Sequence, residues 1–347
     1  IPIILFFTSL LLGNDIVNIP YFFQEKRSFE LEEQLIYSVA TANNGDVFAG
    51  TNDGLFVKLN NNSNWKKVSG IDNPTYFVSI HEKNVIAISG KIKNNILSEG
   101  KVHSILGETN KLDSKIPEKL RIDIKRCHFT IKGGYGFLSS EDKLNIFPLN
   151  KIGKNNLKLK SMNIGTGQIN QLFAKNKQSI FIASDTGFFR KNGKSWNKIQ
   201  PSSGDRSWAL TDSRSVTIDS KNRLWFASPQ GVGVLNGEKW TLYEGQDGLP
   251  YNDFTKMAAG INGDVWFGTK KGAIHFDGKT WEYRQGMRWL PNDHVNDISV
   301  AKDGSVWIAT SKGLSHIFKE KMTLAEKAKF YEDEIDKYHR RTPYEFV

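Results

Sequence analysis

Aromatic and arginine side chains gather in three short stretches of the second half of the chain, at residues 204–214, 251–253 and 288–294. Aromatic rings stack on the apolar faces of sugars, and a guanidinium group forms paired hydrogen bonds with a carboxylate or sulfate. These residue types together fit a small-molecule or oligosaccharide ligand, and in particular a carbohydrate or an anionic glycan. The candidate ligand-binding residues are Arg206, Trp208, Arg214, Tyr251, Arg288, Trp289 and His294.

Residues that recur with the repeat can be distinguished from candidates that occur only once. Leu249-Pro250 and Leu290-Pro291 recur at a fixed interval, and an Asn-Asp pair follows each of them. A feature that repeats with the fold is expected to pack between repeats or to cap loop amides. The residues that repeat least, and are the better site candidates, are Arg206, Trp208, Arg288, Trp289 and His294.

The sequence contains no catalytic motif of the G-x-S-x-G, H-E-x-x-H or P-loop type. His294 beside Asp293 is weak support for acid–base chemistry, and the other histidines show no metal-ligand spacing. The single cysteine, Cys127, excludes both a disulfide within the chain and a cysteine metal cluster. We therefore expect ligand binding rather than catalysis, with no cofactor and no metal.

The net charge of +10 raises the question of acidic partners. The lysines, however, are scattered through Lys/Asn-rich loops such as Lys151–Lys160, without a basic helix or an RNA-binding motif. No specific nucleic-acid partner is expected.

The elements that must position the candidates follow from a repeat. Trp225, Trp266 and Trp307 are 41 residues apart both times, and Trp240 and Trp281 keep the same interval. A fixed period of about 40 residues, made of short β-rich pieces without a helical pattern, is typical of propeller blades.

The repeat resembles the two-component-regulator propeller repeat, in which D-G-x-[VL]-W-[IF]-[AG]-T-x-x-G-L is followed by W-x-x-Y and G-L-P. The stretch Asp303-Gly304-Ser305-Val306-Trp307-Ile308-Ala309-Thr310-Ser311-Lys312-Gly313-Leu314 matches nearly every position. The resemblance covers three units well and fades toward the N-terminus. It implies a propeller of the kind used as extracytoplasmic ligand-binding sensors, and it names no ligand.

A Ser or Thr that ends the second strand of each unit counts the blades. The intervals between these positions are 38, 50, 45, 44, 41 and 41 residues. The sequence therefore predicts an all-β fold, a seven-bladed β-propeller of four-stranded antiparallel blades, with a long loop or extended hairpin at Lys91–Glu118 between two weak units. The counting residues are Thr51, Ser89, Ser139, Ser184, Ser228, Thr269 and Thr310.

In such blades the links between blades and the turns from the second to the third strand share one face, which we call the upper face. Propeller ligands usually bind there, and all seven candidates belong to segments expected on this face.

Ring closure is predicted to use both ends of residues 21–320. The last unit supplies three strands and lacks a Trp-x-x-Tyr strand, whereas Tyr21–Phe29 precedes the first unit. We expect residues near Tyr21–Gln24 to form the outer strand of the seventh blade, because open sheet edges invite aggregation. The rival interpretation is an open or six-bladed ring.

The two ends of the chain carry other signals. Residues 1–20 form a signal-peptide-like segment, because Ile1–Leu12 is almost wholly apolar and too short to span a membrane. This predicts a secreted, periplasmic or otherwise extracytoplasmic protein without a further membrane span. The alternatives are a buried strand or part of a longer anchor.

Residues 321–347 are predicted to form a C-terminal α-helix and linker. Thr323 and Glu326 form a capping box, and an apolar stripe follows at helical spacing. The helix is expected at about Leu324–Arg341 and should lead to or dock another domain, with Leu324, Tyr331 and Ile335 buried.

Three functions fit these observations. The leading one is an extracytoplasmic sensor-type propeller that binds a ligand, such as a carbohydrate or anionic glycan, on its upper face. The second is a polysaccharide lyase or hydrolase that uses the same face. The third is a non-catalytic protein-interaction module.

Overall fold

The computed structural model describes residues 22–341 except 61–63, 107–109, 194 and 209–210, so the apolar segment 1–20 lies outside the described residues. The chain divides into two compact units. One is Arg27–Ile317, and the other combines Ile1–Lys26 with Phe318–Val347.

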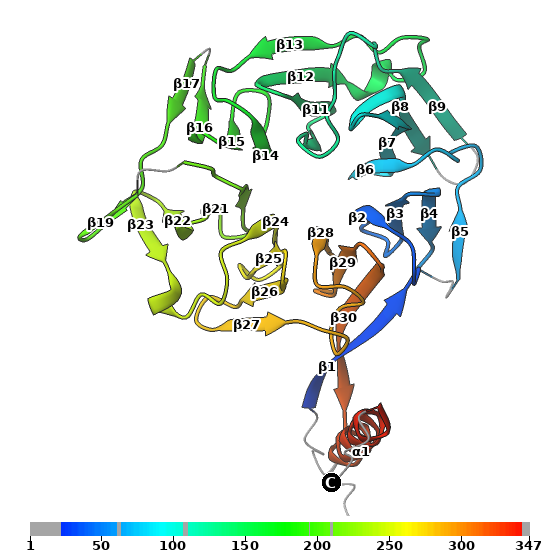
Figure 1. The fold of residues 1–347 in the computed structure, drawn as a ribbon, viewed down its shortest axis with the longest axis vertical. Coiled ribbons are helices and arrows are strands. Elements are labelled where there is room, and N and C mark those ends of the chain that lie inside the picture. The colour runs from blue at the N-terminus through cyan, green and yellow to red at the C-terminus, as the bar shows by residue number, and fades with distance from the viewer. Residues whose placement is uncertain (1–21, 61–63, 107–109, 194, 209–210, 342–347) are drawn as a thin grey trace, which may run out of the picture. The chain divides into compact units, whose positions relative to one another are not determined.

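Seven four-stranded antiparallel sheets make up the propeller, which confirms the predicted fold (Figure 1). Blade 1 consists of β2 (Ile36–Thr41), β3 (Val47–Thr51), β4 (Gly54–Lys58) and β5 (Trp65–Lys67). Blade 2 consists of β6 (Thr75–His81), β7 (Asn84–Lys93), β8 (Ile96–Leu106) and β9 (Asn110–Lys115). Blade 3 consists of β10 (Phe129–Lys132), β11 (Tyr135–Ser140), β12 (Lys143–Pro148) and β13 (Lys160–Asn163). Blades 4 and 5 are β14 (Ile169–Ala174), β15 (Ile180–Ser184), β16 (Gly187–Asn192), β17 (Ser195–Lys198); and β20 (Ser215–Ile218), β21 (Leu224–Ser228), β22 (Gly231–Asn236), β23 (Lys239–Tyr243). Blades 6 and 7 are β24 (Phe254–Ala259), β25 (Val265–Thr269), β26 (Gly272–Phe276), β27 (Trp281–Arg284); and β28 (Val295–Val300), β29 (Val306–Thr310), β30 (Gly313–Met322), β1 (Phe22–Glu30).

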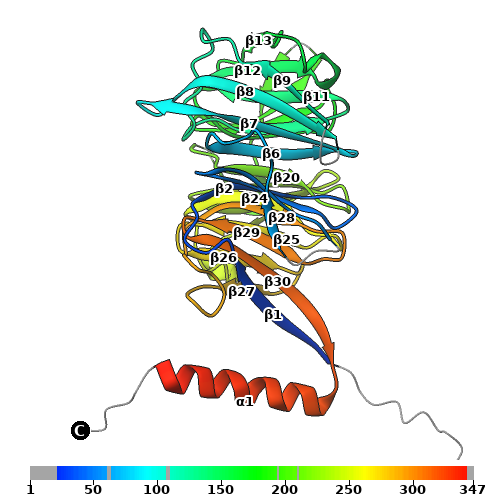
Figure 2. The same ribbon diagram turned by 90° about the vertical axis from the view of Figure 1, so that its right-hand side faces the viewer.

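Three short elements lie outside the blade strands, two of them between blades and one, η1, within blade 3. The hairpin of β18 (Ser202–Ser203) and β19 (Arg206–Ser207) precedes blade 5, and the 3-10 helices are η1 (Leu149–Lys151) and η2 (Gly245–Asp247). The segment Lys91–Glu118, expected as a long loop or extended hairpin, contains the end of β7 and all of β8 and β9, and the long β7–β8 hairpin is visible in Figure 2.

The last blade takes its outer strand from the start of the chain. Its strand order is β1-β30-β29-β28, so the strand expected near Tyr21–Gln24 is observed at Phe22–Glu30. The Glu30 carboxylate accepts hydrogen bonds from Lys58 Nζ (2.8 Å) and Trp65 Nε1 (3.0 Å) of blade 1. Blade 7 is thereby tied to blade 1 through its outermost strand.

In four of the seven blades the counting Ser or Thr closes a turn through its hydroxyl. In blade 6, Thr269 Oγ1 donates to the carbonyl of Gly272 (2.8 Å) and accepts from the amide of Lys271 (3.0 Å). Gly272 has φ +131°, a conformation that favours glycine, and an added Cβ would lie 2.6 Å from the carbonyl oxygen of Arg284. Thr51, Ser184 and Thr310 make the same bond in blades 1, 4 and 7.

A bulge on the innermost strand links blades directly. The strand register shifts at this point in five blades. In three of them the extra residue donates a side-chain hydrogen bond to a backbone carbonyl at the start of the next blade: Asn170 to Ser213 (2.7 Å), Thr255 to Val295 (2.7 Å) and Asn296 to Ile36 (2.8 Å). The third of these bonds joins blade 7 to blade 1.

The core is divided into clusters between successive blades. Trp225 of β21 is fully buried and packs edge-on against Phe267 and Phe276 of blade 6, with ring centroids 6.4 and 5.9 Å apart. Burial of rings of this size between sheets is the main stabilising contribution of the repeat.

The second unit contains helix α1 (Leu324–Arg341). The predicted capping box is present: Glu326 N donates to Thr323 Oγ1 (3.3 Å), and Thr323 N donates to Glu326 Oε2 (2.8 Å). The expectation that the stripe is buried is wrong for the described chain, because Leu324, Tyr331 and Ile335 are 61, 44 and 54% exposed. The helix is amphipathic, and these three side chains of its apolar stripe are exposed. None of the helices that the structure describes has the length and apolar character to cross a bilayer.

Candidate functional site

Two of the candidates, Arg288 and Trp289, lie on the upper face in the link from β27 to β28. The Trp289 ring lies near two guanidinium groups, with its centroid 4.7 Å from Cζ of Arg284 and 5.7 Å from Cζ of Arg288. Arg284 is held by Glu282 (2.9 Å), whereas Arg288 is exposed and forms no ion pair with any described residue. The cluster therefore presents an aromatic ring beside one fixed and one solvent-facing cation.

Tyr251 lies on the same face, in the link from blade 5 to blade 6. Its ring contacts that of Tyr283, with centroids 5.0 Å apart, and Lys271 Nζ lies 5.2 Å from the Tyr251 ring centroid. Burial raises the pKa of Tyr283 above its ordinary value, so this phenol stays protonated at physiological pH. We call Tyr251, Lys271, Tyr283, Arg288 and Trp289 the upper-face cluster.

Trp208 does not belong to a binding surface. Its side chain is 3% exposed, its ring packs edge-on against Phe226 (6.0 Å), and its Nε1 donates to Glu244 Oε1 (3.0 Å). A buried ring cannot stack on a ligand, so the prediction for Trp208 is corrected: it fills the interface between blades 4 and 5.

Arg206 supports the same region. Its Nη1 donates to Asp247 Oδ2 (2.6 Å) and to the carbonyl of Leu242 (2.9 Å). The guanidinium of Arg206 also lowers the pKa of the Asp247 carboxyl. Asp247 is in η2, so Arg206 attaches the β18–β19 hairpin to blade 5 and its charge is already paired.

The other two candidates, Arg214 and His294, are held by neighbours in their own loops. Arg214 pairs with the carboxylate of Asp212 just before β20. His294 is exposed, and its backbone amide donates to Asn292 Oδ1 (3.0 Å) in a tight loop turn. The structure thus places Tyr251 in the link before blade 6, and Arg288, Trp289 and His294 in the link before blade 7. Tyr251 packs between blades 5 and 6 and Trp289 between blades 6 and 7. The other three candidates lie in the link before blade 5: Arg206, Trp208 and Arg214.

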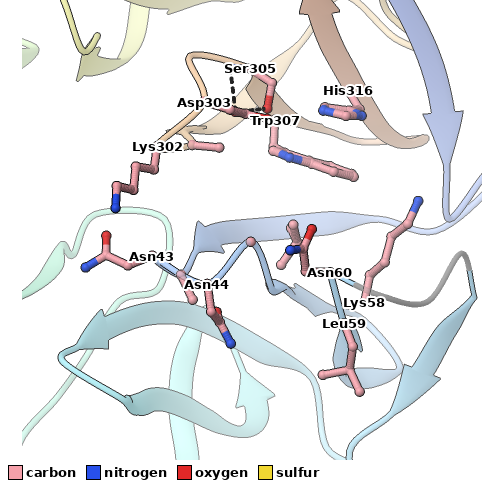
Figure 3. A pocket seen from close by; sticks show the side chains of 14 residues that line it. Asn43, Asn44, Lys58, Leu59, Asn60, Lys302, Asp303, Ser305, Trp307 and His316 are labelled. Atoms are coloured by element: carbon pink, nitrogen blue, oxygen red, sulfur yellow. Dashed lines mark hydrogen bonds between the residues drawn. The ribbon is translucent and has the colours of Figure 1, made fainter.

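A pocket that sequence reasoning missed lies on the opposite face, at the seam between blades 7 and 1 (Figure 3). It has a volume of about 470 Å³. Trp307 forms part of its wall and stacks on His316 with centroids 4.0 Å apart and planes 8° from parallel. Asn43 and Lys302 face each other across its mouth.

His316 has a counterpart 41 residues earlier, His275, which stacks on Trp266 at 4.5 Å. The two imidazoles have different neighbours. His275 contacts Asp264 Oδ2 (3.0 Å) and Glu282 Oε2 (3.1 Å), whereas Lys58 lies near His316. We call Trp266, His275 and Glu282 the blade 6 row.

These neighbours move the two pKa values in opposite directions. For His275, burial opposes protonation, but hydrogen bonds to Asp264 and Glu282 outweigh burial and raise the pKa above 6.5. For His316, burial together with the charge of Lys58 lowers the pKa to about 4. At neutral pH the seam pocket is therefore lined by a neutral imidazole.

The pH dependence of stability is expected to separate these histidines. The stabilisation from His275 is complete below pH 6.5 and is lost as the pH rises through its raised folded-state pKa. His316 resists protonation in the folded state, so stability is lost as the pH falls from 6.5 toward about 4. In urea unfolding at several pH values, His275→Gln should flatten the loss above pH 6.5 and His316→Gln the loss below it. Parallel pH profiles for both variants would contradict the assignment.

Blade 2 contains a serine, a histidine and an aspartate in hydrogen-bonded series. Ser89 Oγ lies 2.7 Å from His103 Nε2, and His103 Nδ1 lies 2.7 Å from Asp113 Oδ1. Ser89 and His103 are each 2% exposed, so a substrate carbonyl has no access to the hydroxyl. The series instead ties β7, β8 and β9 together through buried polar side chains.

The central channel holds a partly buried charge pair. Lys256 Nζ lies 3.4 Å from Asp297 Oδ1, and the other carboxylate oxygen accepts from Ser38 Oγ (2.7 Å) and Val39 N (3.1 Å). Lys256 also lies 3.4 Å from His128 Nδ1. The pair joins blades 6, 7 and 1 at the axis of the ring.

Comparison with known proteins supports the fold and the repeat. The sequence profile of the two component regulator propeller matches residues 290–312. No match to a curated protein was found.

Solved structures with the same architecture share little sequence with the chain. A streptogramin B lyase matches with a TM-score of 0.63 at 12% identity, over 86% of this chain and 98% of that one. The extracellular domain of a putative hybrid two component system from B. thetaiotaomicron matches with a TM-score of 0.62 at 16% identity, over 85% of this chain. The chain spans 40% of that larger protein chain. Virginiamycin B lyase from Staphylococcus aureus matches with a TM-score of 0.61 at 10% identity, over 85% of this chain and 99% of that one. At these identities the likeness establishes the fold alone.

Proposed function

We propose that this two-component regulator propeller acts as an extracytoplasmic sensor domain that binds a ligand on the upper face of blades 6 and 7. The observation that carries the proposal is the Trp289 ring with Arg284 and Arg288 beside it. The ligand class that fits is a carbohydrate bearing a carboxylate or sulfate, because a ring face and a guanidinium fork then act on one molecule.

Each member of the upper-face cluster has a distinct role in this proposal. Trp289 supplies the stacking surface, and Arg288 supplies the cation that reaches the anionic group of the ligand. Tyr251 extends the aromatic surface toward blade 5, and Lys271 adds a second positive charge beside it. His294, one loop turn away, is exposed and can contact the edge of a bound oligosaccharide.

In this proposal the remaining three candidates stabilise the link between blades 4 and 5 instead of contacting the ligand. Arg206 and Trp208 hold the link between blades 4 and 5, and Arg214 is paired with Asp212. The exposed stripe on α1 is, in this proposal, the surface that a further domain of the sensor contacts.

Binding of acidic oligosaccharides to the purified chain tests the proposal. After a glycan array identifies a binder, calorimetry should show that Arg288→Ala weakens its affinity about tenfold, the cost expected for a charged hydrogen bond. The matched control is Arg190→Ala, because Arg190 also lies beside a ring, that of Phe181 (5.6 Å), but in blade 4. Arg190→Ala should leave the affinity unchanged.

Three outcomes would contradict the proposal. Equal affinity of the Arg288→Ala variant would place the ligand elsewhere. Shortened or unsaturated products of the bound glycan would show a lyase or hydrolase instead of a sensor. No binding to any acidic or neutral glycan would favour the protein-interaction module.

A further inference from the structure

The interface between blades 1 and 2 opens into a cleft of about 1090 Å³, larger than the seam pocket. Its walls are mostly apolar and come from both blades, and its volume slightly exceeds the range usual for small-molecule sites, about 300–1,000 Å³. The residues that form the walls include Phe48, Val57, Val68, Ile80, Ile105 and Leu106.

The repeat explains why this interface is open. The blade 6 row fills the corresponding place with a tryptophan, a histidine and a glutamate on three neighbouring strands. In blade 1 the same three places hold Phe48, Val57 and Lys66, which pair in the same register. A smaller ring, a valine and a flexible lysine leave the outer part of the interface unfilled, and the apolar walls remain in contact with water.

Water-exposed apolar walls are unfavourable, so an apolar occupant would stabilise them. Leu106 is 48% exposed at the edge of the cleft, while Val57, Val68 and Ile80 are only partly buried. Covering such surface contributes about 25 cal/mol per Å².

The rim of the cleft carries two available cations. Lys66 and Lys83 are exposed, and neither forms an ion pair with any described residue. Lys67, the third lysine of the rim, is engaged by Asp53 (3.3 Å) and Asp72 (3.4 Å).

Two carboxylates also border the cleft. The oxygens of Asp46 accept hydrogen bonds from Asn44 Nδ2 (2.7 Å) and from the amide of Asn60 (3.0 Å). The side chain of Glu82 is 82% exposed to solvent. The charged residues that line the cleft are thus three lysines, Lys66, Lys67 and Lys83, and two carboxylates, so the rim carries an excess of one positive charge.

We propose that this cleft binds an amphipathic anion, a small molecule with an extended hydrocarbon part and one carboxylate. The hydrocarbon lies between blades 1 and 2 against Val57, Val68 and Ile80, and the carboxylate lies at the rim between Lys66 and Lys83. The cleft is bordered by the β2–β3 turn, on the face opposite the upper-face cluster. The two sites are independent, and the failure of one proposal leaves the other standing.

Calorimetric titration of the full chain with dodecanoate, below its micelle concentration, tests this site. Dodecanoate should bind, whereas dodecyltrimethylammonium, with the same chain and a cationic head, should bind at least about tenfold more weakly. Equal binding of the two surfactants would overturn the assignment of the head group to Lys66 and Lys83.

Variants locate the site. Val57→Phe fills the cleft and should abolish dodecanoate binding without lowering the melting temperature, because Val57 is only partly buried. The double variant Lys66→Gln, Lys83→Gln should weaken dodecanoate about tenfold and leave the cationic surfactant unchanged. The matched control is Lys198→Gln, which removes an exposed lysine from β17, the outer strand of blade 4.

Other results would overturn the proposal. Unchanged dodecanoate binding in Val57→Phe would show that the molecule binds elsewhere. Concentration-dependent dimerisation in sedimentation experiments, lost in Val57→Phe, would show that the cleft receives a second copy of the chain instead of a small molecule.

Discussion

A chain shortened by residues 1–30 is expected to lose most of the stability of its propeller, by about 5 kcal/mol or more, which is comparable to the whole net stability of a typical domain. The deletion removes β1, so β30 becomes the open edge of a three-stranded sheet. It also removes Glu30, whose carboxylate binds Lys58 and Trp65 of blade 1. Thermal unfolding and solubility of the purified variant measure the loss.

Two control variants of the same chain test whether the loss of stability comes from β1 and its bonds to blade 1. Deletion of residues 1–21 alone keeps β1 and should leave the unfolding transition in place. Glu30→Ala in the full chain removes the two bonds to blade 1 but keeps the strand ladder, and should cost about 2 kcal/mol. A melting temperature that is the same with and without residues 1–30 would show that the ring does not depend on its outer closing strand.

Asp297→Ala is expected to be the most damaging single substitution in the central channel, at about 3–5 kcal/mol. The carboxylate accepts hydrogen bonds from Ser38 Oγ and Val39 N of blade 1 and lies 3.4 Å from Lys256 Nζ. Its loss leaves the ammonium in a confined channel without its counter-ion and removes the acceptor that holds blade 1. Urea unfolding of the variant gives the free-energy change.

Two control experiments distinguish the cost of leaving the Lys256 ammonium unpaired from the cost of lost packing. Asp53→Ala, which removes an exposed carboxylate paired with Lys67, should change the free energy of unfolding little. In a Lys256→Met background, Asp297→Ala should cost less than in the unmodified chain, because no ammonium is left unpaired. Equal costs in both backgrounds would show that Lys256 and Asp297 do not act as a pair.

The number of blades was predictable because a Ser or Thr recurs at the same place in all seven units. In four of them, as in blade 6 where Thr269 binds Gly272, the hydroxyl closes the turn after the second strand. Ser89 and Ser139 keep this place in the weak units, although their hydroxyls bond with His103 and His128 instead. The fold could therefore be predicted before any tertiary contact was known.

The candidate site was less predictable, because a residue that does not recur in the repeat can have either of two roles. It can belong to a binding surface, or it can fill an interface between blades. Arg288 and Trp289 depart from the repeat on an exposed link, as a binding residue would. Trp208 departs from it because an inserted hairpin brings an extra ring into the core. Sequence alone does not distinguish an extra side chain that faces solvent from one that fills an interface.

The paired histidines illustrate a related limit. His275 and His316 occupy the same place in two repeats, and this equivalence is visible in the sequence. Their charge states are set by residues from other strands and from the next blade, such as Glu282 and Lys58. Such partners become known only when the ring is assembled.

The side-chain hydrogen bonds from the bulge residues to the next blade cannot all form at the same stage of synthesis. Asn170 and Thr255 reach residues 43 and 40 positions further along, so during synthesis their donors emerge first and each later blade meets a completed neighbour. Asn296 reaches back across 260 positions to Ile36, whose carbonyl has emerged long before its donor exists. Closing so long a loop is slow compared with adding neighbouring blades. A ribosome-bound chain that ends before Asn296 should therefore carry a row of ordered blades with its first edge still open, and this edge is the one that a chaperone would have to shield.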